Sequence, residues 1–260
     1  MLITVGSLKG QPAVTTTALG LAAVLSAGAR VLLVEADPSG GDLASNFRVP
    51  IAPGLVELAS QTSTLVSGVD AAVLERFTRR LPAGGGVSAI VAPPAGSRTV
   101  AAVAVVAVGR GRVLRQPDVT VVADVGRVSP ASAAWPLMEA ADRMVLMMRG
   151  RLGDLAHLHG LLPELLAAVG GRLTIVLCAG GGGYRPAQVT DSVHTAVREA
   201  GLPSLCPPVW GPLPHDETTA RMLAGERKPH KKWRHTPLMR ALDELAADLT
   251  RQPAATGGGR

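Results

Sequence analysis

Two loops near the start of the chain carry side chains suited to phosphate chemistry. The first follows an apolar run at residues 2–5 and reads Lys9-Gly10-Gln11-Pro12-Ala13-Val14-Thr15-Thr16. The second follows an apolar run at residues 31–34 and reads Glu35-Ala36-Asp37-Pro38-Ser39-Gly40-Gly41-Asp42. A lysine, a glycine and hydroxyls just before a helix suit phosphate and magnesium, and carboxylates at a strand end can orient water. This order predicts the front half of a nucleotide-binding βαβ unit.

The first loop lacks much of what a phosphate loop normally uses. Gln11 and Ala13 stand where glycines would let the backbone turn inward, and a side chain at a positive-φ position costs on the order of 1 kcal/mol. Val14 offers neither a charge nor a donor to a phosphate. What remains is the start of a helix at Thr15, whose N–H groups and dipole still favour an anion.

Further candidates lie on oxygen-bearing side chains. Asp124 ends an otherwise apolar run at residues 119–126, where burial of a carboxylate is costly unless it has a partner. The Thr15 hydroxyl suits a magnesium ion, and it equally suits a helix cap. Asp37 either orients a water molecule or forms a plain turn with the three residues that follow it. Both interpretations of Asp37 stay open.

The elements that must position these residues alternate along the chain. The pattern predicts a doubly wound, mostly parallel α/β sheet flanked by helices, in one domain of residues 1–251 with a flexible tail at 252–260. Strands are expected at residues 2–5, 31–34, 87–91, 119–126, 143–148, 173–178 and 206–210. Helices are expected at 15–26, 54–60, 69–81, 131–140, 153–169, 186–200, 216–224 and 237–250. The segment 98–115 fits a helix or a strand, and a helix is favoured because the segment lies between two expected parallel strands.

Composition narrows the class of protein. The 260 residues are 47% hydrophobic and only 2% aromatic, which suits one core built from Ala, Val and Leu. Only Cys178 and Cys206 are present, without the spacing of a disulfide or zinc framework. The longest apolar run, residues 100–108, is far shorter than the ~20 residues of a membrane span. Because the first strand begins at once, without a secretory leader, we expect a cytoplasmic protein.

A basic run near the end of the chain is the main concentration of charge. Residues 227–235 carry five lysines and arginines, no acid and one tryptophan, in a chain with a net charge of +6. Such a run can hold a phosphate backbone without reading its sequence, and it can equally be a solvated loop between helices. The helix expected at 237–250 has apolar residues at helical spacing and is expected to pack on the sheet.

These motifs resemble the deviant-Walker ATPases of the ParA/MinD family, which have the P-loop NTPase fold. The family loop runs Lys-Gly-Gly-x-Gly-Lys-Thr-Thr, so this chain has a degenerate Walker A loop. Lys9, Gly10, Thr15 and Thr16 match it, whereas Gln11, Ala13 and Val14 depart from it. The segment at residues 210–216 is similar to the family loop beside the base and brings in Pro214 and Asp216. Cys178 stands where the family often has an asparagine that reads adenine.

The resemblance implies a set of roles. ATP and Mg²⁺ are the implied cofactors, with Thr15 and Asp124 at the metal. Asp37 would orient the attacking water, and Lys9 would reach the phosphates of a partner subunit in a homodimer. The residues implied at the nucleotide are Lys9, Gly10, Gln11, Ala13, Val14, Thr15, Thr16, Pro214 and Asp216.

Three functions follow as expectations. The first is an ATPase homologue with weak or absent hydrolysis that acts as a cytoplasmic positioning or assembly factor. It would dimerise and bind a protein partner of a pilus or secretion system, as TadZ/CpaE-like proteins do, or of a partition system. The alternative is an active ATPase that uses Lys9 in trans to partition DNA or another cargo. The third is a nonspecific DNA-binding protein that needs no nucleotide.

Overall fold

The structure is a computed structural model that describes residues 1–9, 13–62, 71–82, 85–180 and 183–251. Two of the predicted nucleotide-binding residues, Gly10 and Gln11, lie outside these ranges. The predicted flexible tail at residues 252–260 also lies outside them.

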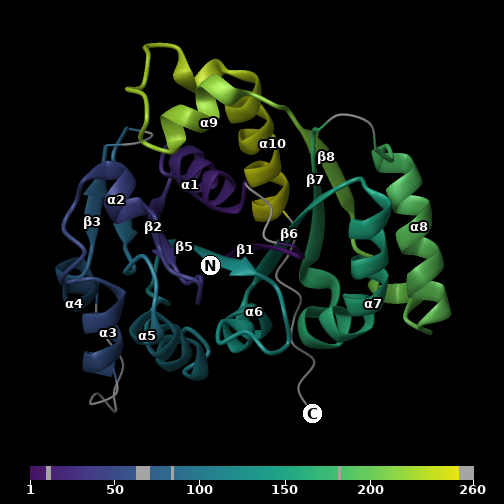
Figure 1. Ribbon diagram of the computed structural model, residues 1–260, viewed down its shortest axis with the longest axis horizontal. Helices are drawn as coiled ribbons and strands as arrows, with labels where there is room; N and C mark the ends of the chain where they lie inside the picture. The colour runs from purple at the N-terminus through teal and green to yellow at the C-terminus, as the bar shows by residue number, and fades with distance from the viewer. Residues whose placement is uncertain (10–12, 63–70, 83–84, 181–182, 252–260) are drawn as a thin grey trace.

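One eight-stranded sheet forms the centre of the described chain (Figure 1). Its strand order is β3-β4-β2-β5-β1-β6-β7-β8. All neighbouring strands pair in parallel except β3 and β4, which are antiparallel. The strands are β1 (Leu2–Ser7), β2 (Arg30–Glu35), β3 (Arg79–Leu81), β4 (Val87–Ile90), β5 (Val119–Arg127), β6 (Arg143–Arg149), β7 (Leu173–Cys178) and β8 (Val209–Leu213).

Helices cover both faces of the sheet, as Figure 1 shows. One face packs against α1 (Val14–Leu25), α2 (Leu43–Phe47), α9 (Glu217–Leu223) and α10 (Pro237–Arg251). The other face packs against α3 (Leu55–Thr62), α4 (Ala71–Arg76), α5 (Ser97–Val108), α6 (Trp135–Ala140), α7 (Leu152–Val169) and α8 (Pro186–Glu199).

The central strands bury both of their faces, which is why they read as continuous apolar runs. Along β5, Val121 and Ala123 join the apolar cluster on the α5 side, whereas Val122 joins the cluster on the α1 side. Successive side chains of a strand point to opposite faces, so one run of valine and alanine contributes to both halves of the core. A sheet buried on both faces leaves its strand ends as the places for polar side chains.

The predicted fold class is confirmed, and the predicted strands are present within a few residues. The helix predicted at residues 69–81 is partly wrong: α4 ends at Arg76 and the edge strand β3 follows. Gly85 and Gly86 have positive φ angles that let the chain reverse, so residues 79–81 pair with β4. The last strand begins at Val209 and not at Cys206, because Pro207 and Pro208 have no N–H to donate to a ladder.

Two further details concern helices. The short helix α2 carries no clear apolar period and was not expected from the sequence. The final helix packs on the sheet as predicted, with Leu238, Met239, Leu242 and Leu245 buried. Among the described residues, no helix combines the length and apolar character that crossing a bilayer requires.

Candidate functional site

The ends of β1, β2 and β5 bring together Lys9, Thr15, Asp37 and Asp124. Parallel pairing places Glu35 of β2 opposite Asp124 of β5, and Ser7 of β1 opposite Arg127 of β5. Because these strands run in the same direction, their carboxyl ends share one edge of the sheet, where α/β folds bind ligands. The loops after β1 and β2 therefore open beside the end of β5.

A direct hydrogen bond joins the two candidate magnesium ligands. The Thr15 hydroxyl, in the first turn of α1, donates to the Asp124 carboxylate at 2.6 Å. The other Asp124 oxygen accepts the Gly126 N–H at 3.0 Å. Burial raises the pKa of Asp124 to about 6, although the hydrogen bonds from Thr15 and Gly126 act to lower it. A hydroxyl and a carboxylate within contact distance are two of the hard oxygen donors that Mg²⁺ takes.

Val14 lies next to this pair and faces the core. Its side chain is only 6% exposed and belongs to the apolar cluster between α1, α10 and the sheet. Ala13, at the N-cap of α1, supplies no side-chain acceptor to the first turn. The first turn therefore keeps backbone donors and a helix dipole for an anion, while its valine adds no charge.

Asp37 forms the turn that its sequence allows, and its carboxylate lies at the end of β5. One of its carboxylate oxygens accepts the Ser39 N–H at 2.7 Å, which makes the turn after β2. The carboxylate also packs against Gly126, where an added Cβ would overlap with it. Gly126 has a φ of 61°, so this position favours glycine for its backbone conformation as well. The turn thus sets the Asp37 carboxylate beside the end of β5.

Glu35 has a role in shaping the loops around the site. Its carboxylate is 2% exposed and accepts the N–H groups of Asp42, Leu43 and Ala92 at 2.7 to 2.9 Å. Burial raises the pKa of Glu35 to about 7, the three hydrogen bonds oppose that rise, and the nearby Asp124 charge adds to it. Glu35 therefore joins the loops after β2 and β4 and does not line the cavities described next.

The first cavity, which we call the β2–β5 pocket, has a volume of about 550 Å³. It lies over the ends of β2 and β5, and Lys9 is exposed at its rim. A Cβ added to Gly153 would lie 3.8 Å from the Lys9 Nζ, so Lys9 extends toward the first turn of α7. The predicted residues that line it are Lys9, Ala13, Val14, Thr15, Thr16, Asp37 and Asp124.

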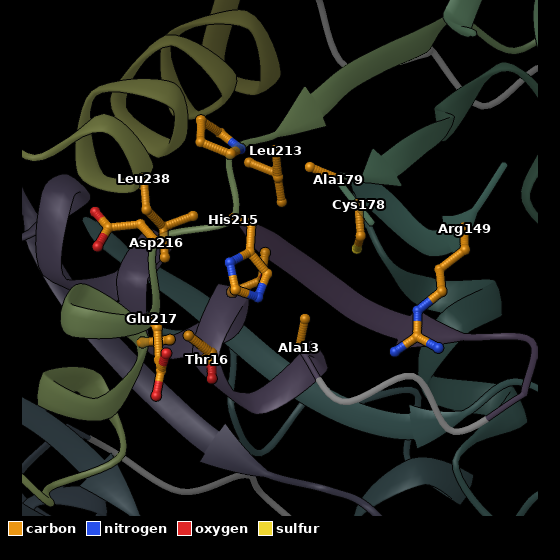
Figure 2. A pocket seen from close by; sticks show the side chains of 13 residues that line it. Ala13, Thr16, Arg149, Cys178, Ala179, Leu213, His215, Asp216, Glu217 and Leu238 are labelled. Carbon is orange, nitrogen blue, oxygen red and sulfur yellow. The ribbon is translucent and has the colours of Figure 1, made fainter. Parts of the chain in front are cut away.

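The second cavity, the β7–β8 pocket, lies on the other side of the first turn of α1 and has a volume of about 250 Å³ (Figure 2). Its walls include Ala13 and Thr16 from α1, Cys178 at the end of β7, and residues 213–217 after β8. Pro214, one of the predicted nucleotide-binding residues, lines this pocket. Asp216 lines it too, but its carboxylate caps α9 by accepting the Thr219 N–H at 3.0 Å and points away from the cavity in Figure 2.

Cys178 gives this pocket a weakly polar wall. Burial raises the pKa of its thiol to about 11, despite the opposing influence of Arg149, so the group stays neutral near pH 7. A thiol is a poor donor and a poor acceptor, and it reads a base less well than an amide does. The wall of the pocket therefore offers no strong hydrogen-bonding group at this position.

Arg149 and His215 also line this pocket, and neither was assigned a role from the sequence. Arg149 ends β6, and His215 follows β8, and Figure 2 shows the side chains of both on the walls of the β7–β8 pocket. The signal for Arg149 was present in the sequence. It is a lone charge at the end of the apolar run at residues 144–148, the same pattern that singled out Asp124.

Comparisons with known proteins find the same architecture. No protein-family model matches the chain, and no curated protein matches it in sequence. Three solved structures cover almost all of it. A ParA family ATPase from Chlorobium tepidum has a TM-score of 0.69 at 16% identity, over 95% of this chain and 97% of that one.

The other two structures were solved with nucleotides. The septum site-determining protein MinD from Pyrococcus horikoshii, complexed with Mg-ADP, has a TM-score of 0.67 at 16% identity over 96% of this chain and 97% of that one. An McdA variant from Cyanothece, complexed with ATP, has a TM-score of 0.64 at 17% identity over 97% of each chain. The class that the fold defines is that of the α/β proteins with a mostly parallel central sheet covered by helices on both faces. Within that class, the chain has the ParA/MinD fold.

Proposed function

We propose that this chain is a ParA/MinD-like protein with an eroded nucleotide site, which binds ATP or ADP and hydrolyses ATP slowly or not at all. It works as a homodimer in the cytoplasm, as a positioning or assembly factor with a protein partner from a pilus, secretion or partition system. The fold supports the nucleotide class, and the neighbouring structures with Mg-ADP and ATP support the choice of ligand.

The described residues suit Mg²⁺ and a base better than they suit the phosphates of a nucleotide. Thr15 and Asp124 would hold the metal, which would supply positive charge beside the phosphates. The first turn of α1 would bind phosphate through its N–H groups, and the β7–β8 pocket would take the base. Val14 fits a phosphate poorly, because an aliphatic side chain neither donates a hydrogen bond nor carries charge.

The burial of Val14 beside the Thr15–Asp124 hydrogen bond is the observation on which the proposal rests. The two oxygens that would hold the metal, on Thr15 and Asp124, are in contact, while the neighbouring Val14 side chain packs into the core at 6% exposure. Hydrolysis requires the outer phosphate to be held in line with the attacking water. Asp37 alone cannot provide that alignment. The site is thus equipped for binding better than for catalysis.

Adding back the missing charge tests the proposal. Val14 lines the β2–β5 pocket, so a lysine at this position has a route out of the core into that pocket. We expect Val14→Lys to raise the affinity for Mg-ATP about tenfold or more, since hydrogen bonds to charged groups contribute roughly 1.5–3 kcal/mol. Calorimetric titration with Mg-ATP and Mg-ADP gives the affinities, and phosphate release gives the hydrolysis rate.

A methionine variant is the matched control. Val14→Met has a long, unbranched side chain without charge, so it should fold like the lysine variant and leave the affinity for ATP unchanged. The eroded-site proposal fails if the unmodified protein hydrolyses ATP as fast as an intact ParA family ATPase measured in parallel. It also fails if Val14→Met tightens binding as much as Val14→Lys does.

The alternative function is an active ATPase that uses Lys9 in trans to partition DNA or another cargo. One observation favours it: Lys9 is exposed at the rim of the β2–β5 pocket and belongs to none of the ion pairs among the described residues. A lysine without a counterion on the open side of the site is available to a second subunit. The exposed lysines of residues 227–235 would then bind the DNA cargo.

Substitution of Lys9 separates the two functions. If Lys9 acts in trans, Lys9→Ala abolishes ATP-dependent dimerisation, measured by light scattering after size exclusion with and without Mg-ATP. If Lys9 is an ordinary surface lysine, dimerisation is unchanged. Lys228→Ala, which removes an exposed lysine far along the chain, is the control for the loss of one positive charge.

A further inference from the structure

Arg149 stands at the same edge of the sheet as the phosphate-facing loop. It is the last residue of β6, and β6 pairs in parallel with β1, the strand that leads into the loop. The register places Met147 opposite Ser7. Lys9 and Arg149 each follow two residues later, Lys9 in the loop just after β1 and Arg149 at the last position of β6, so both positive charges lie at the end of the sheet where α1 begins.

The backbone around Arg149 is held in place by its neighbours. The buried Asp154 carboxylate, in the first turn of α7, accepts the Arg149 N–H at 3.3 Å. On the next residue, the Gly150 carbonyl accepts the Tyr184 N–H at 2.6 Å. In the described part of the chain, no carboxylate forms an ion pair with the Arg149 guanidinium. The strand end is therefore fixed while the charged group is left for another partner.

The guanidinium lines the β7–β8 pocket. Figure 2 shows it reaching from the end of β6 toward the level of Ala13, on the wall opposite Asp216 and Glu217. Among the described residues that line this pocket, Arg149 is the one whose side chain is positively charged at every physiological pH. Its register partner on β7 is Cys178, which is neutral near pH 7 and gives it no counterion.

We propose that Arg149 binds the phosphate chain of a nucleotide in the β7–β8 pocket of its own subunit and supplies part of the positive charge that Val14 cannot. The inference rests on the proposed function, because it assigns a residue to the nucleotide site proposed there. A guanidinium presents several N–H donors in a plane and binds phosphate oxygens in pairs. The Arg149 side chain approaches the phosphates from β6 and not from α1. It would therefore hold them from a different side than a lysine at position 14 would.

The test compares ligands with and without phosphates. We expect Arg149→Gln to weaken the binding of ADP and ATP about tenfold or more, the loss expected for a charge-assisted hydrogen bond. Binding of adenosine should change by less than about twofold, since adenosine has no phosphate for the guanidinium to hold. Arg149→Lys, which keeps the charge but loses the planar pair of donors, should fall between the two.

Arg151→Ala is the matched control, because it removes an exposed arginine two residues away that does not line the pocket. Thermal melting without ligand checks that all variants fold, and melting with ADP gives a second measure of binding. The inference is wrong if Arg149→Gln and Arg149→Lys bind ADP as the unmodified protein does. It is also wrong if ADP and adenosine are weakened alike, which would make Arg149 a structural part of the pocket wall.

Failure of the proposed function gives a different result. If the unmodified protein binds neither ATP nor ADP in the presence of Mg²⁺, the nucleotide site itself is refuted, and the role of Arg149 is refuted with it. If the unmodified protein binds both and the Arg149 variants do so equally well, the nucleotide site stands and only the assignment of Arg149 falls.

Discussion

Two buried carboxylates shape the ends of the central strands. Glu35 holds three backbone N–H groups and Asp124 holds the Thr15 hydroxyl, yet burial raises the pKa of both, to about 7 and about 6. Each carboxylate is thus more easily protonated in the folded chain than in the unfolded one. The stability of the protein must therefore depend on pH in a range where most carboxylates have finished titrating.

The direction of that dependence follows from Glu35. Its pKa is raised from 4.5 to about 7, so its stabilising contribution is complete below pH 4.5 and is lost as the pH rises through 7. At ~1.4 kcal/mol per tenfold change in proton affinity, the loss is on the order of 3 kcal/mol. We expect urea unfolding to give a higher free energy at pH 5 than at pH 8, and Glu35→Gln to reduce this difference.

Asp124 also makes the folded state less stable as the pH rises from 3.8 to about 6. Because Asp124 is present in the unmodified protein and in the Glu35→Gln variant, the difference between the two still reports on Glu35. The exposed Glu199 provides the control, because Glu199→Gln should keep the pH dependence of the unmodified protein. Equal pH dependence in the Glu35→Gln variant and the unmodified protein would show that Glu35 titrates normally in the folded state.

Among the helices, α9 and α10 depend on one side chain at their junction. Asp216 caps α9 through the N–H and hydroxyl of Thr219, at 3.0 and 2.7 Å. It also interacts with the Leu238 N–H and the Thr236 hydroxyl at the start of α10. Burial alone would raise the pKa of Asp216, but these hydrogen bonds hold it below its ordinary value. One carboxylate thus joins two helices that form a wall of the β7–β8 pocket.

Removal of that carboxylate should loosen the pocket wall. We expect Asp216→Ala to lower the free energy of unfolding by about 1–2 kcal/mol, the cost of a lost N-cap, and Asp216→Asn to lower it by less. Chemical denaturation measures both. Glu217→Ala, at the exposed neighbouring position, should stay within about 0.5 kcal/mol of the unmodified protein. A loss as large in Glu217→Ala as in Asp216→Ala would argue against the cap.

For the molecule as a whole, alternating apolar runs were enough to predict the sheet and most of its helices. A long buried strand such as residues 119–127 can be recognised from its own sequence, because both of its faces must be apolar and it appears as a continuous apolar run. The antiparallel edge strand β3 could not be predicted in this way. Its three residues gain their pairing from a glycine-containing turn and from β4, which is a property of tertiary context and not of the local pattern.

The site was predictable to the extent that a charge interrupted an apolar run. Asp124 was singled out by this logic, whereas Thr15 was singled out as a hydroxyl at the start of a helix, and the structure brings the two into contact. The capping role of Asp216 rests on Thr219, three residues further along the chain, and was not assigned from the sequence. The inward packing of Val14 depends on residues of α10, more than a hundred residues away, so the sequence around Val14 carries little trace of it. Arg149, like Asp124, is a single charged residue in an apolar run. A search that included basic as well as acidic residues would have found it.

The first turn of α1 is a wall shared by two cavities, since Ala13 and Thr16 line both of them. A molecule that binds in one cavity and changes the conformation of this turn must alter the free energy of binding in the other cavity. Thermodynamic reciprocity then requires the second molecule to change the affinity of the first by the same factor. The affinity for a cargo or subunit bound over β2 and β5 would then depend on whether the β7–β8 pocket is occupied, because residues 13–16 connect the two cavities.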